Sequence, residues 1–273
     1  MGKKRVSSSP LKVLIQWIQR QYLIVKLILG GIATLCSLVA LKTLVKDRDM
    51  LFVASESSHI IGILILIYKL TTKQSCSGLS LKSQELTAIF LAARLVCSVM
   101  IEGDIHTLLD SITLASTLWV IYMLRFKFKS TYIKDFDTIS LFYVVIPCGI
   151  LSILVHPKGR WFVIGSVLWS FCLSVEALSM LPQLRFMQNA KMIEPFTAHY
   201  VFALGISRFV GCAHWIIQIY ETNGAYLVLA GKGNLFLLLV FVAETVQTFI
   251  LADFCYYYVK SVAKGKIIES LPV

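Results

Sequence analysis

The chain has 273 residues, of which 57% are hydrophobic and 15% are charged. A soluble domain carries roughly 25% charged residues, so this composition excludes an ordinary soluble protein and indicates an all-α polytopic membrane protein. The net charge of +11 is spread along the chain without a basic patch of interleaved aromatic residues, so nucleic-acid binding is not predicted.

The first 50 residues are expected to form a basic cytosolic tail and an extra membrane helix. The tail, MGKKRVSSSPLKVLIQWIQR at 1–20, could touch anionic lipid head groups. The apolar segment 24–45 could cross the membrane, with Lys26 and Lys42 reaching from its ends toward water. Its apolar stretch is longer than that of a secretory signal and no A-x-A site follows, so a cleaved signal is not predicted.

Seven further apolar segments each approach the roughly 20 residues that a helix needs to cross hydrocarbon. They lie at 52–70, 84–101, 107–124, 138–155, 161–181, 198–219 and 235–258. These segments do not alternate as the strands of a membrane barrel do. If the N-terminus is cytosolic and all eight segments cross, most lysines and arginines fall on the cytosolic side, as the positive-inside rule requires. We therefore expect 7–8 transmembrane helices, with both termini in the cytosol.

Three parts of the chain follow from this pattern. Residues 1–50 hold the tail and the probable extra helix, residues 51–260 hold a seven-helix membrane domain, and residues 261–273 form a cytosolic tail.

Motifs of enzymes and metal sites are missing from the sequence. There is no HExxH, GxSxG, P-loop or GxGxxG motif, and the seven cysteines form no CxxC pair. Glu102, Asp104 and His106 are close in sequence, but they fall on a short lumenal turn where solvated polar residues are ordinary. We therefore expect no enzyme activity, no metal site and no cofactor.

Two arginines stand in the middle of apolar segments: Arg94 in TAIFLAARLVCSVM and Arg208 in HYVFALGISRFVGCAHW. A guanidinium keeps its charge, and placing one at mid-bilayer costs from about 2.5 to above 10 kcal/mol. Ser83 and Thr197 each stand eleven residues before one of these arginines, at the opening of its segment. This repeated spacing predicts two three-helix bundles joined by segment 138–155, with a site at their interface.

Two explanations for the arginines remain open. They could face one cavity between the bundles and hold an anionic ligand, because the guanidinium fork matches a carboxylate. Alternatively, each could pair with an intramembrane acid such as Glu176, Glu244 or Asp253 and serve only the structure.

Several short motifs resemble the family of ER-retention (KDEL/HDEL) receptors. They are CSGLSLKSQ (76–84), FLAAR (90–94), FKSTY (128–132), LPQL (181–184), HYVFALG (199–205) and SVAKGK (261–266). The resemblance begins near residue 53 and implies two three-helix bundles plus a linker helix, similar to SWEET and PQ-loop transporters. Residues 1–50 would be an extension.

The resemblance also implies a function. Such receptors bind the C-terminal tetrapeptide of escaped ER lumenal proteins in the Golgi, and return them to the ER in vesicles with a retrograde coat. The matching residues are Arg94, Arg208, Trp169 and Trp215 for ligand binding, His59 and Glu176 for the pH response, and Lys264 and Lys266 for the coat. This places the protein in ER and Golgi membranes.

Simpler interpretations exist for several of these residues. His59 could be a helix-packing hydrogen bonder, the two tryptophans could belong to an interfacial aromatic belt, and the tail lysines could be anchors. The chain also departs from the family pattern at Cys97, Ser166, Ser207, Gly211 and Gln218. These departures imply altered or weakened cargo binding. The alternatives are a PQ-loop/SWEET-type small-solute transporter, which two central arginines disfavour for neutral sugars, and a scaffold paralogue without cargo binding.

Overall fold

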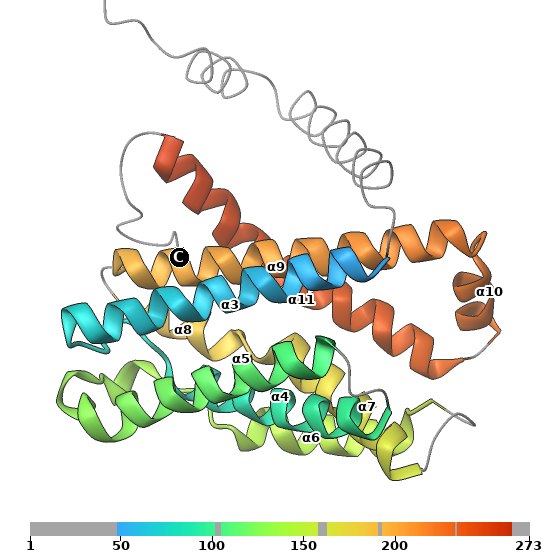
Figure 1. Cartoon of the computed structure of the whole chain (residues 1–273), viewed down its shortest axis with the longest axis horizontal. Coiled ribbons are helices and arrows are strands. Elements are labelled where there is room, and N and C mark those ends of the chain that lie inside the picture. The colour runs from blue at the N-terminus through green and yellow to red at the C-terminus, as the bar shows by residue number, and fades with distance from the viewer. Residues whose placement is uncertain (1–47, 102–104, 158–162, 191–192, 233, 264–273) are drawn as a thin grey trace, which may run out of the picture.

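The structure is a computed structural model that describes residues 48–101, 105–157, 163–190, 193–232 and 234–263. All regular elements within these ranges are helices (Figure 1). The α-helices are α3 (Arg48–Lys73), α4 (Leu81–Ile101), α5 (Ile105–Tyr122), α6 (Phe142–Leu154), α7 (Val163–Leu178), α8 (Leu181–Asn189), α9 (Pro195–Glu221), α10 (Ala225–Gly231) and α11 (Leu235–Ala263). The predicted extra helix at 24–45 and the tail lysines Lys264 and Lys266 lie outside the described residues.

Six helical segments are long and apolar enough to cross a membrane, which confirms an all-α polytopic membrane protein. They are Met50–Lys73, Leu81–Met100, Thr107–Lys127, Val163–Asn189, Pro195–Glu221 and Leu235–Ala263. The third segment continues α5 through a π-helical turn, Met123–Lys127, and the fourth combines α7 with α8.

The segment expected at 138–155 is a helix, but it is shorter than the sequence predicted. α6 has 13 residues, which at 1.5 Å per residue reach about 20 Å, against about 30 Å of hydrocarbon. The chain before it is held in a loop, because the Asp137 carboxylate accepts hydrogen bonds from Ser80 Oγ at 2.8 Å and from the Lys82 amide at 3.0 Å. Residues 138–141 must therefore lead away from the start of α4 before a helix can begin.

The packing of the long helices repeats itself. In the first triplet α5 contacts both α3 and α4, and in the second triplet α11 contacts both α7 and α9. Between the triplets, the first helix of each packs on the middle helix of the other, so that α3 lies along α9 and α4 lies along α7 (Figure 1). The two triplets are therefore related as a parallel repeat, with α6 packed against α7 at the junction.

Small residues bring α3 and α9 close together. Ser58 Oγ donates to the Ala203 carbonyl at 2.9 Å, and a Cβ atom added to Gly62 would lie 3.4 Å from Ala203 Cβ. One turn further along, Ser55 Oγ donates to the Ser207 carbonyl at 2.9 Å. Small and hydroxyl residues at this spacing are how membrane helices approach without a hydrophobic driving force.

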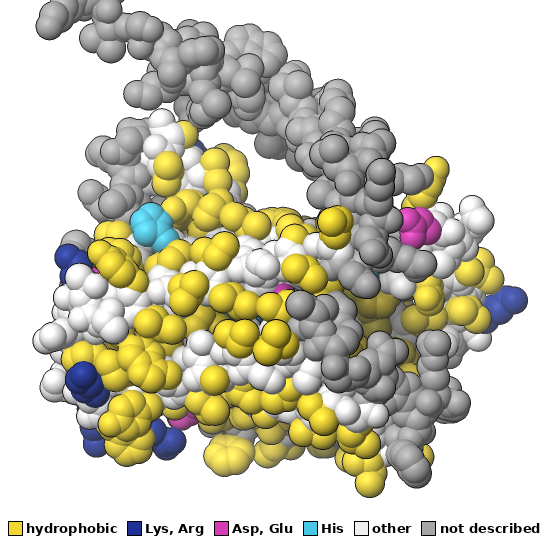
Figure 2. All heavy atoms as spheres, in the orientation of Figure 1, with side chains coloured by type: hydrophobic (Ala, Val, Ile, Leu, Met, Phe, Trp, Pro, Cys, Tyr) yellow, Lys and Arg dark blue, Asp and Glu magenta, His cyan; other side chains and the backbone are white. Residues whose placement is uncertain are grey.

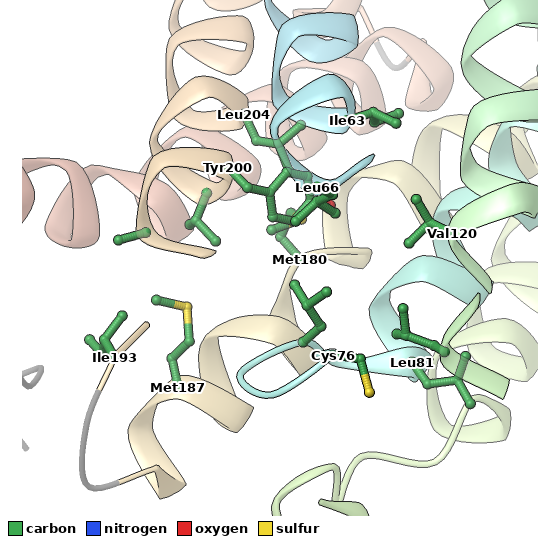
Figure 3. Packing of buried hydrophobic residues seen from close by; sticks show 14 of the residues in the cluster. Ile63, Leu66, Cys76, Leu81, Val120, Met180, Met187, Ile193, Tyr200 and Leu204 are labelled. Atoms are coloured by element: carbon green, nitrogen blue, oxygen red, sulfur yellow. The ribbon is translucent and has the colours of Figure 1, made fainter. Parts of the chain in front are cut away.

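Two apolar clusters hold the triplets together. The larger packs Ile63 and Leu66 of α3 against Tyr200 and Leu204 of α9, with the loop residue Cys76 at one end (Figure 3). The smaller joins α4 to α6 and α7 around Phe90 and Leu91. Because these clusters lie between helices rather than on the lipid side, they fix the positions of the two middle helices, α4 and α9.

A polar network closes the structure at the end where α3 finishes. Lys69, which is buried, reaches Glu194 Oε2 at 2.7 Å and Thr197 Oγ1 at 3.0 Å. Gln183, in the LPQL motif, accepts from the Ser80 amide and donates to the Gly78 carbonyl, each at 2.9 Å. This end carries the loops rich in lysine and arginine, which the positive-inside rule predicts to face the cytosol.

Candidate functional site

The two arginines of the middle helices meet at the interface between the triplets. Arg94 on α4 is 7% exposed and Arg208 on α9 is 9% exposed. Both guanidiniums lie over the ring of Phe90, at 5.7 Å and 6.0 Å from its centre. Neither arginine faces lipid, and the shared aromatic surface lowers the cost of burying two cations side by side.

Arg94 is held by acids from three other helices. Its Nε and Nη2 atoms donate to Asp110 Oδ1 on α5 at 3.0 and 2.6 Å, which makes a two-pronged contact. Nη2 also donates to Glu56 Oε1 on α3 at 2.9 Å, and Nη1 donates to Glu176 Oε1 on α7 at 3.3 Å. Only a planar fork with donors in several directions can serve three carboxylates in this way.

Glu176 joins the two arginines. Its Oε1 atom accepts from Arg208 Nη1 as well as from Arg94 Nη1. Within the described part of the chain, Arg208 forms one ion pair, the pair with Glu176. The two guanidiniums are therefore unequal, because Arg94 is surrounded by three carboxylates while most of the Arg208 fork has no acid on it.

The charges already present in this centre disfavour the entry of a further anion. Two guanidiniums face the carboxylates of Glu56, Asp110 and Glu176. Buried ion pairs of this kind repay their desolvation only when the geometry is good and the remaining groups are hydrogen-bonded. An additional carboxylate can enter only if one of the resident acids gives way or takes up a proton.

His59 lies beside the weakest point of this network. It is 2% exposed on α3, and its Nδ1 atom is 3.9 Å from Glu56 Oε2. Glu56 Oε2 is buried and has no hydrogen-bond partner among the described residues. A protonated His59 could supply that missing donor with only a small movement of either side chain.

Small residues lie near the arginine pair on the side away from the Lys69 network. On α9, Ser207 Oγ lies 3.1 Å from Ser55 Oγ, and a Cβ atom added to Gly211 would meet Ser55 Oγ at 3.8 Å and Glu244 Oε2 at 3.9 Å. On the opposite side, Cys97 is buried and its Sγ contacts the Gly165 carbonyl at 3.7 Å.

The two other residues that differ from the family pattern are Ser166 and Gln218. Ser166 is buried and its Oγ has no partner among the described residues, while Gln218 is half-buried on α9. The five residues that depart from the family pattern are thus spread over three helices: α4, α7 and α9.

The two tryptophans lie on the same side, although not against the arginines. Trp169 precedes Glu176 by seven residues on α7, and Trp215 follows Arg208 by seven residues on α9. Residues seven apart share a helix face, so each tryptophan stands two turns from its charged neighbour, on the side away from the Lys69 network. Trp169 is 38% exposed, while Trp215 packs edge-on against Phe241, with the ring centres 6.2 Å apart.

The structure answers part of the question left by the sequence. Of the three acids proposed as partners, Glu176 binds both arginines. Glu244 on α11 lies beside Gly211 and forms no ion pair with the described residues, and Asp253 is exposed further along α11. The sequence reasoning missed Glu56 and Asp110. Each is the single acid in its segment, 52–70 or 107–124, and an intramembrane acid is by default a functional candidate.

Fold and site together define a polytopic α-helical membrane protein, built as two triplets of helices, with an ion-paired cluster buried at their interface. Such a centre is typical of membrane receptors and transporters whose ligands bind between repeats.

Comparison with known proteins gives the family. The family model described as ER lumen protein retaining receptor matches residues 75–218. An ER lumen protein-retaining receptor of Caenorhabditis elegans is 34% identical over 222 residues, which cover 81% of this chain and 98% of that protein. ER lumen protein-retaining receptor 2 of Homo sapiens is 34% identical over 218 residues (80% and 96%), and the receptor of Drosophila melanogaster is 31% identical over 217 residues (79% and 96%). The chain belongs to the ER lumen protein-retaining receptor family.

Proposed function

We propose that this protein binds the C-terminal retention signals of ER lumenal proteins, of the KDEL or HDEL type, and returns those proteins from the Golgi to the ER. It acts as a receptor without enzyme activity. The ligand is the terminal carboxylate of the signal tetrapeptide together with the side chains before it. Lys264 and Lys266, in the C-terminal tail, would engage the retrograde vesicle coat.

One observation carries the proposal: two buried arginines from equivalent helices share a single carboxylate, Glu176. A peptide carboxylate has the same charge and shape as the Glu176 side chain, so it can compete for the same guanidinium nitrogens. Arg208 is the better first contact, because fewer resident acids occupy its fork. The Arg94 side chain keeps its position when the ligand binds, since three acids hold it in place.

Acidification strengthens binding in this scheme. The centre already holds three carboxylates against two guanidiniums, so a fourth carboxylate is repelled unless protons enter. Protonation of His59 beside Glu56, or of one resident acid, removes the excess negative charge. The signal is therefore held in the more acidic Golgi lumen and released in the neutral ER.

The ligand enters from the lumenal side. The opposite end is closed by the network around Lys69 and Gln183, whereas Trp169 and Trp215 stand two turns lumenal of the charged residues. Small side chains at Cys97, Ser207 and Gly211 give the incoming peptide fewer contacts than larger polar residues would. Binding is consequently weaker than in family members with the usual pattern.

A binding measurement on the purified full chain tests the proposal. Peptides ending in KDEL or HDEL, and the same peptides with an amidated C-terminus, are titrated at about pH 5.5 and about pH 7.2. The free carboxylate should bind more tightly at the lower pH, and amidation should abolish binding. Arg208→Lys should weaken binding at least about tenfold, because lysine keeps the charge and loses the fork.

Arg185→Lys is the matched control, because Arg185 is exposed on α8 at the cytosolic end. Its affinity should equal that of the unaltered protein. Equal binding of free and amidated peptides would remove the terminal carboxylate from the proposal. No binding of any retention-signal peptide at either pH would leave the scaffold interpretation.

A further inference from the structure

A groove of about 570 Å³ opens at the cytosolic end, far from the arginine pair. It lies between the start of α4, the π-helical turn that follows α5, and the short 3₁₀ turns Lys129–Thr131 and Lys134–Phe136. Its lining is Leu81, Lys82, Leu124, Arg125, Phe126, Lys129, Tyr132, Lys134 and Asp137. This volume is within the range of small-ligand sites, and π-helical turns occur often at functional positions.

The groove is strongly basic. Lys82, Arg125, Lys129 and Lys134 line it, and Asp137 is the acid among the lining residues. In the described part of the chain, neither Lys129 nor Lys134 forms an ion pair with an acid. The dark blue side chains in Figure 2 gather at the end of the molecule where this loop lies in Figure 1.

The nearby acids leave this charge largely in place. Asp137 is occupied by three donors: Ser80 Oγ, the Lys82 amide and the Tyr132 hydroxyl, the last at 2.6 Å. Glu85 lies outside the groove lining and approaches Lys82 at 3.3 Å and Arg125 at 3.8 Å. Asp135, on the Lys134–Phe136 turn, is exposed and lies outside the groove lining. Four cations against these three carboxylates still leave a surplus of positive charge at the groove.

The groove also has an apolar side at the level of the membrane surface. The membrane-spanning segment that contains α5 ends at Lys127, and Phe126 within the lining is 69% exposed. Tyr122, one turn earlier, is 55% exposed, and the centre of its ring lies 5.5 Å from the centre of the Phe126 ring. Exposed aromatic rings beside lysines mark the boundary between hydrocarbon and head groups.

These features together favour a ligand with a phosphate group and a lipid tail. A soluble anion would leave the exposed ring of Phe126 without a partner. Basic pockets at the cytosolic ends of membrane helices bind the phosphorylated head groups of anionic lipids. We propose that this groove binds the phosphorylated head group of an anionic lipid of the cytosolic leaflet, such as a phosphoinositide, with Lys129 and Lys134 on the phosphate.

The cation side chains suit this role. Lys129 and Lys134 are exposed and come from turns rather than from the helical core, so their removal does not open a cavity. Lys82 and Arg125 stand on the other side, where their partner Glu85 keeps them in position. The site does not rest on the proposed recognition of retention signals, since its residues contact neither arginine of that centre.

The test compares two pairs of cationic residues in the full-length protein. The purified protein in phosphatidylcholine nanodiscs is titrated with short-chain phosphatidylinositol 4-phosphate, with phosphatidylcholine of the same chain length, and with the free inositol phosphate head group. The variant Lys129→Gln/Lys134→Gln is matched by Lys73→Gln/Arg185→Gln, which removes the same charge from two exposed residues outside the groove and the turns that bound it. Binding is followed by native mass spectrometry and by the shift in melting temperature.

We expect the phosphoinositide to bind and the groove variant to lose roughly 25-fold in affinity, because each juxtamembrane cation contributes about a factor of five. The control variant should lose no more than about twofold. Three results would overturn the proposal: equal losses in the two variants, equal binding of the free head group and the lipid, or no preference over phosphatidylcholine. Equal losses would mean diffuse surface charge, and an equally bound free head group would mean a soluble anion.

Discussion

Removing Arg94 should destabilise the protein more than the loss of any single surface charge. The variant Arg94→Leu leaves Asp110 without its two-pronged partner and leaves Glu56 without its donor, while Glu176 keeps Arg208. Breaking a buried ion pair from one side costs about 3–5 kcal/mol, because an uncompensated charge remains behind. At roughly 2–4 °C per kcal/mol for a chain of this size, the melting temperature should fall by about 6–20 °C.

The assay is thermal unfolding of the purified protein in one detergent at one pH. A triple variant, Arg94→Leu with Asp110→Asn and Glu56→Gln, removes the stranded charges together with their partner and should recover more than half of the loss. Arg185→Leu, at an exposed position, controls for the loss of one arginine and should shift the melting temperature by less than about 2 °C.

The reasoning would be refuted in either of two ways. Arg94→Leu could melt within about 2 °C of the unaltered protein, which would mean that the acids are not held by this guanidinium. The triple variant could melt no higher than the single variant, which would mean that the loss comes from packing against Phe90 rather than from unpaired charge.

Three further predictions concern other parts of the molecule. A methyl group at Gly205 would overlap Cys255 Sγ, so Gly205→Ala should lower the stability by about 1–3 kcal/mol. Gly149→Ala is the control and should not lower it, because no atom lies within 4 Å of the added carbon. Equal melting temperatures of the two variants would contradict the close packing of α9 on α11. Asp137→Ala removes the acceptor of three hydrogen bonds and should lower the free energy of unfolding by about 1–3 kcal/mol. Urea unfolding in micelles measures this loss, and an unchanged midpoint would contradict it. Burial raises the pKa of the Cys76 thiol above its usual value, so less thiolate is present near pH 8. Site-resolved maleimide labelling of Cys76 should therefore be slower in the folded than in the unfolded chain. Equal labelling rates would show that the loop around Cys76 is open.

Part of the site could be read from the sequence. Arg94 and Arg208 stand out because a guanidinium in an apolar segment needs a partner, and the equal spacing from Ser83 and Thr197 indicated equivalent helices. The geometry agrees: both are buried, and both contact Glu176. The expectation that Lys264 and Lys266 serve a coat remains a prediction, since these residues lie outside the described ranges.

Other features depended on distances that no local pattern contains. Glu56 and Asp110 belong to different segments from Arg94, 38 and 16 residues away along the chain, and periodicity along one helix cannot show which faces of three helices meet. The short α6 was also unpredictable from its apolar run, because the start of that run is held as a loop by hydrogen bonds from Asp137 to α4.

Composition and the order of apolar segments therefore determined the class of protein, the approximate helices and the two central cations. Hydrophobicity acts locally on each segment through its transfer into lipid, so these properties are visible in the linear sequence. The tertiary structure decided which carboxylates hold each arginine, which end of the molecule is closed, and which lysines share a groove with Phe126. Those outcomes come from close packing and short-range electrostatics between helices, and such forces depend on positions in space rather than on position along the chain.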